Sequence, residues 1–225
     1  MAQAVVPRGR TGRAVGVWWL ALTAGAFAVY APLPYLTDGL QAMASGDGGL
    51  AAHYAAQPTW VQVVLYVHMI CSGTALLLSP VQLSSRVRRR TPRTHRVVGR
   101  ITFGALVGGG TAGALLAPFS VAGALGTAGF GLLAVLSVVF PVLGLRSALR
   151  GDLAQHRRWM IRAFALIYAG VMLRLGLIVV VASTGWDFDR AYLLMPFGSW
   201  VPNLLVAEFV LWRSSARRAA RLPRG

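Results

Sequence analysis

The chain has 225 residues, of which 56% are apolar and only 12% charged. An ordinary soluble domain has about 25% charged residues, so this composition excludes a disordered chain and argues against a soluble globular fold. All 22 basic residues are arginine and six residues are acidic, which gives a formal net charge of +16. Because the arginines lie in short clusters between long apolar stretches, they are typical of membrane topology signals, and we expect no nucleic-acid partner.

Six apolar stretches approach the length of a membrane-spanning helix. A hydrocarbon core about 30 Å thick requires about 20 mostly apolar residues. The stretches are approximately residues 14–36, 60–83, 97–117, 122–146, 159–183 and 192–212. We therefore expect an all-α integral membrane bundle of six transmembrane helices over residues 14–212, with basic tails at 1–13 and 213–225. The third and fourth stretches nearly fuse, and we separate them at Pro118, where a tight turn is favoured.

Arginine counts predict which side of the membrane each connection faces. The two tails and the second and fourth connections contain eighteen arginines, whereas the alternate connections contain Arg190 alone. Arginine-rich short loops stay in the cytoplasm, so both termini are predicted to be cytoplasmic. The first stretch follows a basic tail but is longer than the 7–15 apolar residues of a cleaved signal peptide, so we expect a retained helix. These features predict a multi-pass protein of the bacterial cytoplasmic (inner) membrane.

Three ionisable side chains lie just inside the predicted spans on the cytoplasmic side. Arg100, Arg162 and Glu208 are each roughly 6–8 Å from the boundary, at about 1.5 Å per residue. An ionisable group in hydrocarbon costs about 2.5–3.5 kcal/mol on insertion scales and therefore needs a partner. We predict a structural ion pair between Glu208 and Arg100 or Arg162, which would join the third, fifth and sixth helices. A proton relay is the alternative.

A second polar group is predicted in the outer half of the membrane. By the same rise, His68 lies about 12 Å below the outer boundary, and Arg174 lies about 24 Å from the inner one. The two side chains therefore fit one outer pocket, and a snorkelling Arg174 that reaches Asp187 or Asp189 fits equally well. Asn203 follows a proline in the sixth stretch, where it is expected to bind a carbonyl freed by a proline kink or to join the pocket.

Two similar segments each place a histidine beside an arginine at the start of a predicted helix. His95 opens the third helix and His156 opens the fifth, at the same cytoplasmic level. Two neutral imidazoles from different helices can ligate the iron of a b-type haem, and Gly99 one turn after His95 would leave room for the macrocycle. The arginines that would pair with haem propionates, or with phosphates of membrane lipids, are Arg96, Arg100, Arg157 and Arg162.

Several spaced motifs resemble those of a bacterial membrane-protein family, the domain of unknown function 2306. They are Tyr66-Val-His68 with Gly73, Ser79-Pro80-Val-Gln82, Arg88-Arg-Arg-Thr-Pro92-Arg-Thr-His95-Arg96-Val-Val-Gly99-Arg100, Gly151-Asp152-Leu-Ala-Gln-His156-Arg157-Arg158-Trp159-Met160-Ile-Arg162, Leu173-Arg174, and Trp200-Val-Pro202-Asn203-Leu-Leu-Val-Ala-Glu208. The resemblance covers roughly residues 60–210 and implies fold relatives without implying a reaction. A looser likeness to six-helix, ascorbate-reducible cytochromes b lacks their histidine on the fourth helix.

Three classes of function fit these residues. A redox protein would hold one b haem between His95 and His156 and exchange electrons with a quinone whose headgroup meets His68 and Arg174. A binding or transport protein would take an anionic or lipid-like molecule at His68, Arg174 and Asn203, and a transporter of six helices would be expected to form a homodimer. A scaffold would hold another membrane protein. With no hydrolytic set at one depth, we do not expect a stand-alone enzyme, unless it is a membrane oxidoreductase.

Overall fold

Helices make up almost all of the described chain. The computed structural model describes residues 9–45 and 49–219, and these residues contain no strand. Five segments among them are long and apolar enough to cross a membrane as helices. They are Trp19–Thr37, Thr59–Leu83, Pro92–Phe119, Gly123–Leu149 and Leu153–Thr184. The predicted class, an all-α protein with several membrane-spanning helices, is therefore confirmed.

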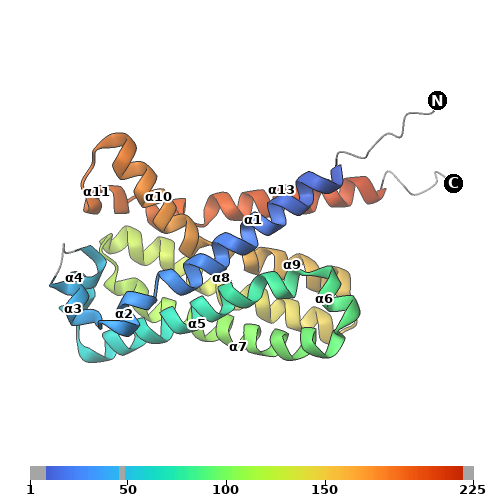
Figure 1. Ribbon diagram of the computed structural model, residues 1–225, viewed down its shortest axis with the longest axis horizontal. Helices are drawn as coiled ribbons and strands as arrows, with labels where there is room; N and C mark the ends of the chain where they lie inside the picture. Colours follow the sequence, from blue (N-terminus) through green and yellow to red (C-terminus); the bar gives the residue numbers. More distant parts are fainter. Residues whose placement is uncertain (1–8, 46–48, 220–225) are drawn as a thin grey trace.

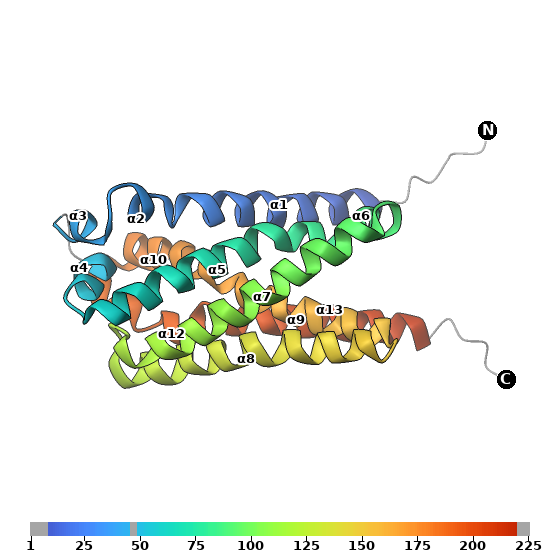
Figure 2. The same ribbon diagram turned by 90° about the horizontal axis from the view of Figure 1, so that it is seen from below.

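The long helices run along one axis and form an elongated bundle (Figures 1 and 2). In chain order the elements are α1 (Gly9–Tyr30), α2 (Leu33–Thr37), α3 (Leu40–Ala44), α4 (Gly49–Ala55), α5 (Thr59–Leu83), α6 (Ser85–Arg90), α7 (Pro92–Leu116), the 3-10 turn η1 (Ala117–Phe119), α8 (Gly123–Leu149), α9 (Leu153–Ile167), α10 (Ala169–Thr184), α11 (Phe188–Tyr192), α12 (Met195–Gly198) and α13 (Val201–Ala219). The turn η1 lies where Pro118 was expected to separate two spans.

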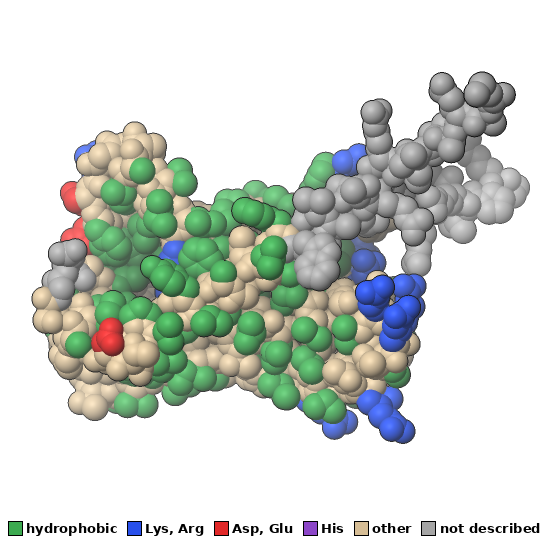
Figure 3. All heavy atoms as spheres, in the orientation of Figure 1, with side chains coloured by type: hydrophobic (Ala, Val, Ile, Leu, Met, Phe, Trp, Pro, Cys, Tyr) green, Lys and Arg blue, Asp and Glu red, His purple; other side chains and the backbone are tan. Residues whose placement is uncertain are grey.

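The two ends of the bundle differ in charge. The start of α1, α6, the α8–α9 turn and the end of α13 lie at one end, whereas α2 to α4 and α11 lie at the other (Figures 1 and 2). Basic side chains gather around α6, and the acidic side chains visible in Figure 3 lie at the opposite end. Of the predicted tails, residues 1–8 and 220–225 lie outside the described residues, whereas 9–13 begin α1 and 213–219 end α13.

The stretch predicted as the sixth span, residues 192–212, is not one helix. α11 ends at Tyr192, α12 begins at Met195 and α13 begins at Val201. Pro196 and Pro202 each occupy the second position of a helix, where a missing N–H and a fixed φ are favourable. The expected kink at Pro202 is therefore wrong, because this proline starts a helix and does not interrupt one. α13 is not among the five candidate spans.

The stretch predicted as the fifth span consists of two helices that meet at Tyr168. α9 begins after Asp152, whose side chain accepts a hydrogen bond from the Gln155 amide at 2.9 Å, a common N-cap arrangement. α9 ends at Ile167, and α10 begins two residues later. The buried Tyr168 forms a 2.6 Å hydrogen bond between its hydroxyl and Thr23 Oγ1 of α1. The break between α9 and α10 is thereby tied to the first helix.

Glycines of α7 allow close packing on both sides of this helix. A Cβ at Gly109 would lie 2.7 Å from Ser72 Oγ of α5, and a Cβ at Gly110 would lie 2.8 Å from Val138 Cγ2 of α8. Small residues at these positions bring helices together in lipid, where there is no water to expel. α7 is therefore packed between α5 and α8.

The segment 37–59, expected to contain a short surface helix, contains α3 and α4 and covers one end of the bundle. The Leu40 amide donates to the Tyr66 hydroxyl at 2.9 Å, and this hydroxyl donates to the Tyr35 carbonyl at 3.1 Å. His53 Nε2 is 2.7 Å from the Phe119 carbonyl oxygen, to which it is bonded as donor. These bonds join the covering helices to α5 and to η1.

Candidate functional site

A cavity of about 230 Å³ lies between α5, α7, α8 and α10, towards the end of the bundle that α4 covers. Most of its lining is apolar or glycine. The polar side chains that line it are Tyr35, Tyr54, His68, Ser72, Ser120, Ser137, Arg174, Tyr192 and Ser199. An apolar cavity with a few convergent polar groups is the usual form of a small-molecule site. His68 and Arg174, for which the sequence left a shared outer pocket as one of two alternatives, both line this cavity.

His68 presents one ring nitrogen to a backbone carbonyl. Its Nδ1 is 2.9 Å from the Gly109 oxygen. Because a carbonyl oxygen only accepts, Nδ1 carries a proton, and in the neutral imidazole Nε2 is then left as an acceptor. A Cβ at Gly113 would lie 3.3 Å from His68 Cε1 and Nδ1. The glycines of α7 therefore make room for the imidazole beside the cavity.

Arg174 lines the cavity from α10. Its Nη1 donates to the Gly170 carbonyl at 3.2 Å, one turn earlier on the same helix. No carboxylate among the described residues lies within ion-pair distance of its guanidinium. Asp187 instead accepts a hydrogen bond from the Arg190 amide at 2.8 Å and is the N-cap of α11. The Arg174 side chain therefore lines the cavity. It does not reach Asp187 or Asp189 in the following loop, which was the other arrangement that the sequence allowed.

Ser199 is a cavity residue that the sequence analysis missed. The residue is 1% exposed, and its Oγ is buried without a hydrogen-bond partner among the described residues. A buried hydroxyl without a partner costs about 1–3 kcal/mol, so this group is suited to bind a ligand. The tyrosines were missed as well, and burial raises the pKa of the Tyr54 phenol above its ordinary value. The Tyr54 hydroxyl therefore stays neutral.

Asn203 does not line this cavity, although the sequence analysis grouped it with His68 and Arg174. Its Nδ2 donates to the Ala165 carbonyl at 3.3 Å and to the Ser199 carbonyl at 3.1 Å. The side chain thus links the start of α13 to α9. Of the two roles considered for Asn203, the structure shows hydrogen bonds to backbone carbonyls. These carbonyls are not freed by a proline kink, which was the expected reason for such bonds.

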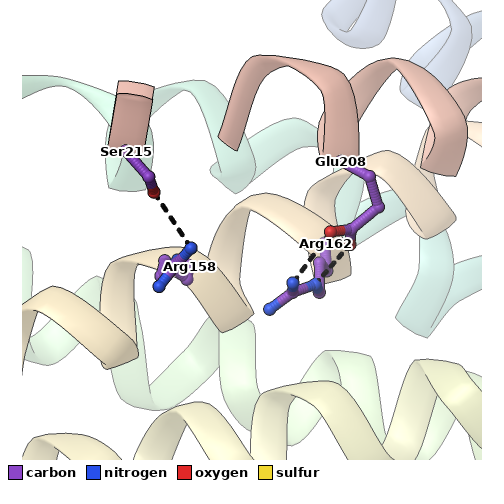
Figure 4. Close-up of polar contacts among 4 residues, drawn as sticks. All are labelled: Arg158, Arg162, Glu208 and Ser215. Atoms are coloured by element: carbon purple, nitrogen blue, oxygen red, sulfur yellow. Dashed lines mark hydrogen bonds and ion pairs between the residues drawn. The ribbon is translucent and has the colours of Figure 1, made fainter. Parts of the chain in front are cut away.

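An ion pair joins α9 to α13 (Figure 4). Arg162 Nε and Nη2 donate to the two carboxylate oxygens of Glu208, at 2.5 and 2.9 Å. Arg162 also lies over the Trp159 ring, at 4.8 Å from the ring centroid. One turn earlier, Arg158 Nη2 donates to Ser215 Oγ at 3.1 Å. Arg100 of α7 is exposed and forms no ion pair with Glu208. The predicted alternative in which Arg100 binds Glu208 is therefore not found.

The two histidines proposed as haem ligands lie near the start of α7 and of α9. His156 Nδ1 donates to the Gly144 carbonyl at 2.8 Å, which leaves Nε2 as an acceptor. His95 Nδ1 is buried without a partner among the described residues. Neither histidine lines the cavity described above. Three of the arginines proposed to pair with propionates or lipid phosphates, Arg96, Arg100 and Arg157, are exposed.

The space beside Gly99 is not open. Gln82 of α5 donates through Nε2 to the His95 carbonyl at 3.2 Å. A Cβ at Gly99 would lie 3.2 Å from Gln82 Oε1. Gly99 was expected to make room for a macrocycle, whereas in the structure it makes room for this glutamine.

A protein-family model matches more than half of the chain. The family model described as Predicted membrane protein (DUF2306) matches residues 65–211. The chain belongs to this family. The matched region of this DUF2306 protein runs from α5 into α13 and contains His68, Arg174 and the Arg162–Glu208 pair. No curated protein and no solved structure matches the chain.

The site of this DUF2306 protein combines one fixed positive charge with neutral polar groups. Arg174 supplies the charge, His68 Nε2 accepts a hydrogen bond, and Ser199 Oγ can donate or accept one. The remaining walls are mostly apolar. This set can bind and orient a partly apolar anion, and it contains no carboxylate among the described lining residues that would act as a general base.

Proposed function

We propose that this membrane protein binds a small amphiphilic molecule through an anionic group in the cavity beside His68 and Arg174. One observation carries the proposal: the Arg174 guanidinium lines a mostly apolar cavity and has no carboxylate partner among the described residues. A charge in such surroundings is costly unless an opposite charge and hydrogen bonds compensate for it. An anionic ligand would supply that charge, and Ser199 Oγ would gain a partner.

The size of the cavity favours a headgroup over a whole lipid. Pockets for drug-sized ligands measure roughly 300–1,000 Å³, and this cavity measures about 230 Å³. A carboxylate or a single phosphate can form a paired hydrogen bond with a guanidinium, which a neutral headgroup cannot do as well. The neutral competitor for the same cavity is a quinone headgroup, as in the redox interpretation of the sequence.

Decanoate and decanol, which share an alkyl chain and differ in charge, test the proposal, and decylubiquinone represents the neutral quinone. The full chain in zwitterionic nanodiscs would be heated with decanoate, decanol or decylubiquinone while tryptophan fluorescence is followed. We expect decanoate at 100 times its Kd to stabilise the folded protein by about 2.7 kcal/mol. Decanol should have no such effect, because it lacks the charge.

Two arginine variants serve as test and control. Arg174→Gln should lose the response to decanoate, whereas Arg190→Gln should keep it, because Arg190 lies over the Trp186 ring at 4.2 Å and outside the cavity. An equal response to decanol, or a response that survives in Arg174→Gln, would contradict the proposal. Stabilisation by decylubiquinone alone would favour the quinone interpretation.

A b-type haem between His95 and His156 is the second candidate function. It is favoured by the bond from His156 Nδ1 to the Gly144 carbonyl, because iron-ligating histidines commonly hold their second nitrogen in this way. The Gln82 side chain beside Gly99 counts against it. Protein purified from haem-supplied cells should show a Soret band that shifts on reduction with dithionite. A flat spectrum would remove this candidate.

The proposed location is the cytoplasmic membrane of a bacterium, with the arginine-rich end of the bundle in the cytoplasm. The charge difference between the two ends supports this orientation, because short basic loops are retained on the cytoplasmic side. In this arrangement α11, α12 and α13 together make the sixth crossing. Both termini would then be cytoplasmic.

A further inference from the structure

A second, smaller cavity adjoins the first on the side of α1. It measures about 100 Å³ and lies between α1, the α1–α2 turn, α5 and α10. Six residues line both cavities: His68, Met69, Ser72, Ile167, Gly170 and Arg174. The His68 and Arg174 side chains therefore stand where the two chambers meet. Nothing lies within 4 Å of a Cβ built on Gly170, so the backbone at this junction borders open space.

The two chambers differ in chemistry. Every polar side chain that lines the smaller chamber, namely His68, Ser72 and Arg174, also lines the larger one. The residues that belong to the smaller chamber alone are Phe27, Ala28, Ala31, Pro32, Gly73 and Leu76. None of these has a polar side chain. The smaller chamber thus extends an apolar path away from the polar groups.

This apolar path leads towards the outside of the bundle. α1 lies along one edge of the bundle (Figure 2). Beyond the chamber-lining Ala28, α1 exposes Val29 and Tyr30, which are 54% and 73% exposed. Figure 3 shows the molecule hollowed between the α10–α11 lobe and α1–α2. In a bilayer the exposed side of α1 would face lipid, so the α1 residues that line the smaller chamber would lie close to the acyl chains.

We infer that the ligand is a single-chain amphiphile whose anionic group lies against Arg174 and whose hydrocarbon chain lies in the smaller chamber beneath α1 and continues into the bilayer. The inference rests on the proposed function and adds the class of ligand and the orientation of its hydrocarbon chain. A chamber of about 100 Å³ holds only the first part of a chain, so the remainder lies among the lipids. A soluble anion of headgroup size would leave this chamber empty.

Chain length is the variable that tests the inference. Butyrate, hexanoate, octanoate and decanoate would be titrated onto the full chain in nanodiscs, with thermal stabilisation as the readout. Each methylene that enters the apolar chamber should tighten binding about fourfold, the equivalent of about 0.8 kcal/mol. The gain should therefore be visible between butyrate and hexanoate, where the chamber is being filled.

Matched variants separate this inference from the proposed function. Ala28→Phe fills the smaller chamber, whereas Ala26→Phe adds the same ring to an exposed position of α1. We expect Ala28→Phe to weaken decanoate binding at least tenfold and to remove the dependence on chain length. Ala26→Phe should behave as the unsubstituted protein. If all carboxylates bind alike and Ala28→Phe has no effect, the inference is wrong but the proposed function stands.

A second measurement does not depend on the stability of the Ala28→Phe protein. Decanoic acid with a photoreactive diazirine a few carbons from its carboxylate, in the part of the chain that the smaller chamber would hold, would be bound and illuminated, and the labelled peptide identified by mass spectrometry. Labelling of residues 27–32, suppressed by excess decanoate, supports a chain beneath α1. Suppressible labelling confined to the far wall of the larger cavity, such as Phe130 or Leu133 of α8, would overturn it. If no carboxylate binds the protein, the proposed function itself has failed.

Discussion

Replacing Gly129 by alanine should destabilise the bundle and disturb the cavity at once. A Cβ on Gly129 of α8 would lie 2.5 Å from Pro196 Cβ and 2.7 Å from the Pro196 carbonyl carbon and oxygen. Favourable carbon–carbon contacts are about 3.5–4.0 Å, so α12 would have to move by about 1 Å. Overpacking of this kind costs about 1–3 kcal/mol. The contact is with backbone and a proline ring, so no flexible side chain can turn away.

The control is Gly104→Ala, because this exposed glycine of α7 has nothing within 4 Å of a Cβ. Both variants gain the same helix propensity, about 1 kcal/mol, so their difference isolates the clash with α12. At about 2–4 °C per kcal/mol, Gly129→Ala should unfold roughly 2–12 °C below Gly104→Ala in nanodiscs. Because Ser199 follows Pro196 by three residues, the response to decanoate should also weaken. Equal unfolding temperatures for the two variants would refute the reasoning.

The remaining predictions concern topology and two cross-helix contacts. Reporter fusions after Ser45 and after Arg90 should report opposite sides of the membrane, and a common side would contradict the proposed crossings. Thr23→Val should lower the free energy of unfolding by about 0.5–1.5 kcal/mol through loss of the 2.6 Å bond to the α9–α10 junction; an unchanged unfolding curve would show that bond to be dispensable. A double-mutant cycle with Glu208→Gln and Arg162→Gln should give a coupling energy of about 1 kcal/mol or less, because the Glu208 side chain is 45% exposed. A coupling of several kcal/mol would mean that lipid shields this pair more than we assume.

The lengths of the apolar stretches predicted where the long helices lie, but not that the last stretch, residues 192–212, is divided among three helices. Hydropathy averages over about twenty residues, so it treats residues 192–212 as one span. The structure begins a new helix at Met195 and another at Val201, each with a proline in its first turn. Proline position is therefore the signal that could have been used, because a proline preceded by turn residues starts a helix more readily than it kinks one.

Depth arithmetic along a helix predicts which residues can reach one another. It placed His68 and Arg174 in the outer half, close enough to share a pocket, and both line one cavity in the structure. The same arithmetic was ambiguous for Glu208, because it could not tell Arg162 from Arg100. It says nothing about rotation around a helix or about hydroxyl groups. Ser199 was missed for this reason, since its importance lies in a buried Oγ without a partner, which only the packed structure reveals.

The cavity exists because several positions that face it lack side chains. Gly109, Gly110, Gly113 and Gly170 line it, and the first three also admit neighbours at distances that a Cβ would not allow. Gly170 differs, because a Cβ there would meet open space, although alanine or leucine would suit a helix better by roughly 1 kcal/mol. No neighbour requires a glycine at this position, so the physical effect of Gly170 is to keep the junction of the two chambers open. Gly170→Leu would close that junction, and on this reasoning it should stabilise the fold while it abolishes the response to decanoate.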